Sequence, residues 1–85
     1  MILHLFTKTS LMSFQIAYRN LQGATEEELQ QGLSTFREMY EDLAKKAAIE
    51  TDPVKLKALK SIANHVSDEI KAHQVRLVTD YNVQT

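Results

Sequence analysis

Two histidines and two carboxylates lie close together near the end of the chain, in the stretch HVSDEIKAH. On a helix, His65, Glu69 and His73 would follow one another at intervals of one turn and share roughly one side. Imidazole and carboxylate groups are suitable ligands for zinc, and the same groups can act as a catalytic acid and base. This stretch is therefore the first candidate for a metal site or a catalytic pair.

The spacing of these groups argues against a metal site. The sequence contains no H-E-x-x-H motif, and EIKAH is one residue longer than the Glu-x-x-His motif of di-iron bundles. His73 also belongs to an apolar helical pattern, whereas His65 does not. We therefore expect no metal and no cofactor, with His73 at a packed interface and with His65, Asp68 and Glu69 facing water. Packing at His73 is then expected to depend on pH, because a histidine side chain changes its charge near neutral pH.

The sequence predicts a helix over residues 26–50. Thr25 and Glu28 have the spacing of a capping box, and Gly23 can end a preceding helix in the left-handed conformation. Gly32 lies in the middle of the predicted helix. It either lets another helix approach closely or lowers the stability of the helix by about 1 kcal/mol with no compensating contact. Apolar residues recur every three or four positions, as on one face of a helix. They are Leu29, Leu33, Phe36, Tyr40, Leu43 and Ala47.

A second long helix is predicted over residues 53–78. Asp52 is a favourable N-cap, and Pro53 suits the first position of a helix, where its missing N–H is not needed. Because the connection between the two long helices is short, we expect them to pack as an antiparallel hairpin. The apolar pattern of the second helix consists of Leu56, Leu59, Ala63, Val66, Ile70, His73 and Leu77.

The two ends of the chain are less regular. We expect a short helix over residues 10–22, preceded by an apolar arm or short strand over residues 1–9. In the C-terminal segment VRLVTDYNV, Val75 and Val78 fall outside the apolar pattern, so pairing of the two ends as short strands is an alternative. The apolar N-terminus is interrupted too early for a membrane span and lacks the features of a signal peptide. We therefore expect a cytoplasmic protein without membrane contact.

We expect one small all-α domain over residues 10–85. The chain has 85 residues, of which 44% are hydrophobic and 25% charged, as in an ordinary globular protein. A core of this size is small, and no disulfide can support it because the chain has no cysteine. Several apolar residues lie outside both patterns, namely Met39, Ala44, Ala48, Ile49, Ile62 and Val75. They favour dimerisation into a helical bundle; in the alternative, the N-terminal third covers them in a monomeric three-helix domain.

No pattern in the sequence is typical of an enzyme. There is no Gly-rich phosphate loop, no nucleophile elbow and no cysteine thiolate. The carboxylates at residues 26–28 suit the positive end of a helix dipole, and those at residues 41–42 are spaced to pair with Lys45 and Lys46. The formal net charge of −1 provides no general attraction for nucleic acid. We expect a protein without enzymatic activity.

Protein binding through helix faces is the function that the sequence favours, as in an adaptor, inhibitor, chaperone or accessory protein. The first group of candidate contact residues is the apolar N-terminus, with Ile2, Leu3, Leu5 and Phe6. The second group, here called the turn lysines, consists of Lys45, Lys46, Lys55, Lys57 and Lys60. Positive charge is unfavourable in the first turns of a helix, so the lysines there can mark contact with an acidic partner. In the alternative, a small dimeric regulator presents the turn lysines to the phosphates of a nucleic acid.

Overall fold

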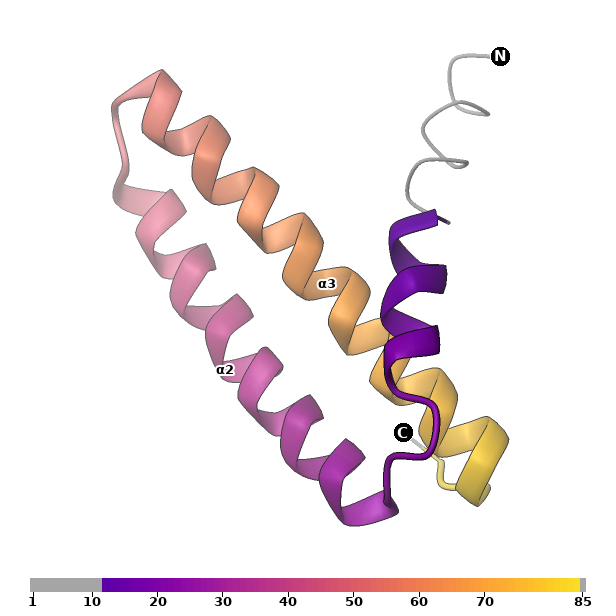
Figure 1. Ribbon diagram of the computed structural model, residues 1–85. Helices are drawn as coiled ribbons and strands as arrows, with labels where there is room; N and C mark the ends of the chain where they lie inside the picture. The colour runs from indigo at the N-terminus through magenta and orange to yellow at the C-terminus, as the bar shows by residue number, and fades with distance from the viewer. Residues whose placement is uncertain (1–11, 85) are drawn as a thin grey trace.

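A computed structural model describes residues 12–84 of the chain, and these residues are all-helical (Figure 1). The first helix is described over residues 12–20, α2 is Glu26–Ile49 and α3 is Pro53–Tyr81. No strand occurs within residues 12–84. Figure 1 shows α2 and α3 side by side, joined at one end by residues 50–52, with the first helix beside the second half of α3.

Part of the sequence prediction falls on residues that the structure does not describe. The arm or strand predicted over residues 1–9 lies outside the described residues, and so do its candidate contact residues Ile2, Leu3, Leu5 and Phe6.

The start of α2 is defined by the signals read from the sequence. Gly23 has a φ of 82°, so it takes the left-handed conformation after the first helix. The Glu28 backbone N–H donates to the Thr25 hydroxyl at 3.1 Å, and the Thr25 backbone N–H donates to the Glu28 carboxylate at 2.8 Å. The predicted capping box is confirmed. The Thr25 backbone N–H, and after it the Thr25 side chain, hold the pKa of Glu28 below its ordinary value.

We predict that Thr25→Ala lowers the free energy of unfolding by about 1 kcal/mol, the usual cost of losing an N-cap side chain. It should also raise the pKa of Glu28 toward its ordinary value, because the contribution of the Thr25 side chain is lost. A lowered pKa in the folded state stabilises the fold above the pKa of the unfolded chain. That stabilisation disappears as the pH falls through the folded-state pKa of Glu28. Over this pH range, the free energy of unfolding should therefore fall less in Thr25→Ala than in the original protein.

Urea unfolding at several pH values and an NMR titration of the Glu28 side chain would measure both effects. Thr51→Ala is the matched control, because Thr51 is exposed and only its backbone N–H is hydrogen-bonded within the described residues. Equal losses of stability in the two variants would contradict the capping role of Thr25.

Helix α3 begins as predicted and continues further than predicted. The Asp52 carboxylate accepts from the Val54 backbone N–H at 2.9 Å, with Pro53 in the first turn. The helix continues past residue 78 to Tyr81 and ends at Asn82, which has a φ of 55°. The strand alternative for VRLVTDYNV is therefore wrong.

Contacts with the N-terminal part of the chain explain the helical C-terminus. Leu77 is fully buried, the Arg76 Nε donates to the Tyr18 carbonyl oxygen, and the Tyr81 hydroxyl donates to the Ala24 carbonyl oxygen. Strand propensity is weaker than tertiary packing of this kind. Helix formation places all three side chains where they can make these contacts.

The core lies at the end of the α2–α3 pair that the first helix covers. Leu29 and Leu33 of α2 and Leu77 of α3 form its centre. Half-buried residues pack against this centre, namely Leu21, Ala24, Ile70 and Val83. Ala17, Val66 and Ala72 are also buried.

Residues 12–84 form no such core in the half of the α2–α3 pair next to residues 50–52. Within the described chain, no residue from 34 to 65 is buried. Two helices alone bury only one stripe each, and among residues 12–84 no third helix shields this half of the pair. The large apolar side chains exposed in this half are Met39, Tyr40, Ile49, Val54 and Ile62.

Candidate functional site

The structure divides the histidine stretch between the core and the surface. His73 is only 4% exposed, whereas His65 is exposed. Asp68 and Glu69, which we expected to face water, are half-buried. Within residues 12–84, no three His, Cys, Asp or Glu side chains gather in a way that could hold a metal ion.

His73 packs against a glycine of the neighbouring helix. A Cβ atom added to Gly32 would lie 2.4 Å from Nε2 and 2.7 Å from Cδ2 of His73. The ring of Phe36 meets the imidazole at an angle, with 5.3 Å between the ring centroids. The other ring nitrogen, Nδ1, lies 2.6 Å from the backbone carbonyl oxygen of Glu69. Gly32 therefore makes room for the imidazole, and the contact serves helix packing.

Arg76 of α3 contacts the first helix. Its Nε donates to the Tyr18 carbonyl oxygen at 3.0 Å, and its guanidinium carbon lies 3.7 Å from the centroid of the Tyr18 ring. Nη1 of Arg76 pairs with the Asp80 carboxylate at 3.2 Å. Donor geometry and stacking of this kind suit arginine in particular. This role of Arg76 is not predictable from the sequence, because nothing in the local pattern shows that Tyr18 lies beside it.

Two of the five turn lysines line a common groove. Lys46 and Lys55, from different helices, line a common groove, whereas Lys45, Lys57 and Lys60 do not line it. Lys46 pairs with Asp42 at 3.0 Å and Lys45 approaches Glu41 at 4.0 Å. Both pairs are exposed, so each contributes little to stability.

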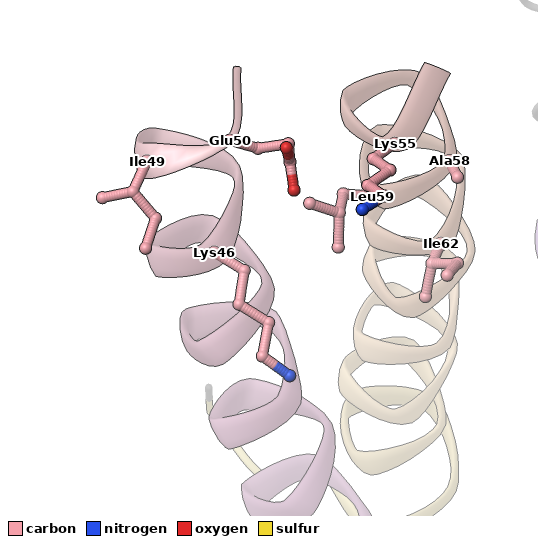
Figure 2. Close-up of a pocket in the computed structure, with 7 residues that line it drawn as sticks. All are labelled: Lys46, Ile49, Glu50, Lys55, Ala58, Leu59 and Ile62. Carbon is pink, nitrogen blue, oxygen red and sulfur yellow. The ribbon is translucent and has the colours of Figure 1, made fainter. Parts of the chain in front are cut away.

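The groove lies between α2 and α3 next to their connection, and we call it the turn groove (Figure 2). Its volume is about 440 Å³. Figure 2 shows Leu59 extending from α3 toward the space between the helices, with the Glu50 side chain across from it. The Glu50 carboxylate accepts from the backbone N–H groups of Thr51 and Asp52, each at 3.1 Å. The lining residues are Lys46, Ile49, Glu50, Lys55, Ala58, Leu59 and Ile62.

Comparisons with known proteins do not assign a function to this site. The chain matches no protein-family model, no curated protein and no solved structure. Among the described helices, none is both long and apolar enough to cross a membrane. The turn groove and the apolar side chains exposed around it are therefore the features of the described chain that bear on its function.

Proposed function

We propose that this chain is a non-enzymatic protein-interaction module whose antiparallel α2–α3 hairpin binds a partner at the turn groove. The observation that carries the proposal is the exposure of large apolar side chains at this groove, where Ile49 is 82% and Ile62 is 50% exposed. Single exposed apolar residues are common on soluble proteins, whereas a group of them around a groove is typical of a contact surface. An adaptor, inhibitor, chaperone or accessory protein would use such a surface.

The spacing of the lining residues supports a helical partner segment. On α3, Lys55, Ala58, Leu59 and Ile62 recur at the positions that form one face of a helix. A helix of a partner can lie in such a groove with its apolar face toward α3. Lys46 and Lys55 would then lie at the polar rim that surrounds the apolar centre of a typical interface.

The charged groups of the groove support binding over catalysis. The Glu50 carboxylate is held by two backbone N–H groups, and Lys46 is paired with Asp42. A catalytic carboxylate needs a desolvated pocket that moves its pKa toward the working pH. Glu50 instead stabilises the connection between the two helices.

Nucleic-acid binding is the second candidate function. It is favoured by Lys55, Lys57 and Lys60, which form no ion pair within residues 12–84. An electrophoretic shift assay at two salt concentrations tests it, because phosphate contacts weaken steeply with salt. Salt-sensitive binding that is lost on replacing these three lysines by glutamine would favour this function over the first.

A photo-crosslinking experiment tests the protein-binding proposal. A photoreactive amino acid placed at Ile62 in the full chain should capture a discrete protein in the native host, and Ala58→Glu should abolish the capture. The matched control carries the photoreactive group at Lys57, which is exposed but does not line the groove. An adduct of twice the mass of the chain would identify a second copy as the partner, in a homodimer. Equal capture from both positions, or none from Ile62, would contradict the proposal.

A further inference from the structure

Four exposed side chains on α2 form a row that begins at the turn groove and continues away from it. They recur at intervals of three, four and three residues, so they share one face of the helix. They are Met39, Asp42, Lys46 and Ile49, here called the α2 row, and all four are exposed. Lys46 and Ile49 line the groove, and Lys46 pairs with Asp42 at 3.0 Å. In chain order, the α2 row is therefore apolar, acidic, basic and apolar.

The α2 row is complementary to its own reverse. If α2 of a second copy lies on this face in the antiparallel direction, centred between Asp42 and Lys46, then Asp42 of each copy meets Lys46 of the other. The same alignment places Met39 of each copy against Ile49 of the other. A two-fold symmetric contact has this reciprocal form, in which one residue meets a second and the second meets the first. The charges and the apolar groups of the α2 row thus fit a second copy of this chain.

The α3 side of the turn groove has its centre of symmetry at the same height. Ala58 and Ile62 line the groove (Figure 2), and an antiparallel second copy centred between them places Ala58 of each copy against Ile62 of the other. This centre is roughly 10 Å along α3 from Pro53, and the centre of the α2 row is roughly 9 Å along α2 from Glu50. Because the two distances agree, one two-fold axis applies to both helices.

The contacts between the first helix and α3 lie outside the overlap of two such copies. An axis roughly 10 Å from residues 50–52 lets the second copy reach roughly 20 Å along the α2–α3 pair, to about Val66 on α3. The first helix is bonded to Arg76 and Thr79, which are roughly 15 Å or more further along α3. The overlap is therefore confined to the half of the pair in which no residue from 34 to 65 is buried.

A parallel arrangement of two copies lacks this complementarity. A two-fold axis along the α2–α3 pair would place α2 of one copy on α3 of the other, with both connections at the same end. Lys46 of one copy would then be close in height to Lys55 of the other, and both side chains line the groove. Like charges that face each other oppose association. The charges at the turn groove therefore favour the antiparallel arrangement.

We propose that the turn groove binds a second copy of this chain, with the two α2–α3 pairs packed antiparallel about one two-fold axis. Asp42 of each copy pairs with Lys46 of the other, which fixes the direction and the alignment of the contact. Met39, Ile49 and Ile62 supply the apolar contact that these pairs surround. The proposal rests on the proposed function, because it names the partner that the turn groove binds.

Complementary charge reversals in the full chain test this pairing. The original protein should dimerise at micromolar concentration, as measured by sedimentation equilibrium. Asp42→Lys alone places like charges together at both symmetry-related pairs of the dimer, and so does Lys46→Asp alone. Each variant should have a dimer dissociation constant at least about tenfold higher than that of the original protein.

An equimolar mixture of Asp42→Lys and Lys46→Asp should recover most of the lost affinity as a heterodimer. Each reversed charge then meets an opposite charge on the other chain. Within each chain, residues 42 and 46 still carry like charges in the mixture. The recovery therefore reports on the contact between chains and not on the Asp42–Lys46 pair within one chain.

Glu41→Lys and Lys45→Asp are the matched controls. Glu41 and Lys45 have the same spacing, approach each other at 4.0 Å and are exposed, but neither lines the turn groove. Both variants should self-associate like the original protein.

A chain that stays monomeric up to high micromolar concentration would overturn the proposal. A dimer that neither Asp42→Lys nor Lys46→Asp weakens would also overturn it, and so would a mixture that does not recover. If a monomeric chain still captures another protein from a photoreactive group at Ile62, this inference fails and the proposed function stands. If the chain is monomeric and nothing is captured, both fail.

Discussion

Leu77→Ala is expected to lower the free energy of unfolding by about 2–5 kcal/mol, the range found when a buried leucine is cut back to alanine. Leu77 is fully buried and packs with Leu29 and Leu33 at the centre of the core. The substitution leaves a cavity in the place where α2, α3 and the residues after the first helix meet. Leu21, Ala24 and Val83 all pack against this cluster, so few neighbours are free to fill the space.

The effect is large relative to the stability that a chain of this length can have. A domain of 85 residues is expected to be stable by only about 4–13 kcal/mol. Urea unfolding followed by circular dichroism measures the loss of unfolding free energy in Leu77→Ala. If the original protein is stable by only the lower value of this range, the variant is expected to be partly unfolded without urea.

Ile49→Ala is the control for Leu77→Ala. Both substitutions remove apolar groups from a helix of the α2–α3 pair, but the Ile49 side chain is 82% exposed. Its replacement should change the free energy of unfolding by no more than about 0.5 kcal/mol. Comparable losses in the two variants would show that the half next to the turn groove contributes to the core of the folded chain. Such a result would contradict the uneven burial on which the proposed function depends.

Short-range signals in the sequence were sufficient to predict the helical elements. The Thr25–Glu28 capping box, Gly23 and the Asp52–Pro53 start of α3 each involve residues a few positions apart. Their hydrogen bonds are local, so the sequence alone specifies them. The C-terminus of α3 was not predictable in this way, because Arg76 and Tyr81 are held by residues of the N-terminal part.

The candidate site was only partly predictable, for a related reason. The apolar patterns indicated which residues face the other helix, and Ile49 and Ile62 were recognised as lying outside them. Which of those residues remain exposed depends on where the first helix packs, and this depends on contacts such as Tyr18 with Arg76. The turn lysines were predicted as a single group from their proximity along the chain. Whether two of them share a groove depends instead on the rotation of each helix about its axis.

Gly32→Ala is expected to destabilise the protein when His73 is present and to stabilise it when His73 is replaced by alanine. In a helix interior, alanine is more favourable than glycine by about 1 kcal/mol. Opposing this gain, the added Cβ would lie 2.4 Å from Nε2 of His73, far inside van der Waals contact. Overpacking of a buried site costs about 1–3 kcal/mol. The imidazole cannot easily move away, because it is 4% exposed, packed against Phe36 and bonded to the Glu69 carbonyl oxygen.

A double-mutant cycle of Gly32→Ala and His73→Ala separates the contact between these two residues from the intrinsic preference of a helix for alanine over glycine. With His73→Ala the clash is absent, so Gly32→Ala should then gain about 0.5–1 kcal/mol, and the coupling between the two sites should be about 1–3 kcal/mol. Urea unfolding of the original protein, the two single variants and the double variant measures this coupling. Gly23→Ala is the control, because Gly23 has a φ of 82° and a Cβ there would meet nothing within 4 Å. Its cost arises from the left-handed backbone alone, so it should be the same with and without His73. Equal effects of Gly32→Ala in both backgrounds would contradict the imidazole contact as the reason for glycine at this position, and would indicate that α2 and α3 are further apart here than the structure shows.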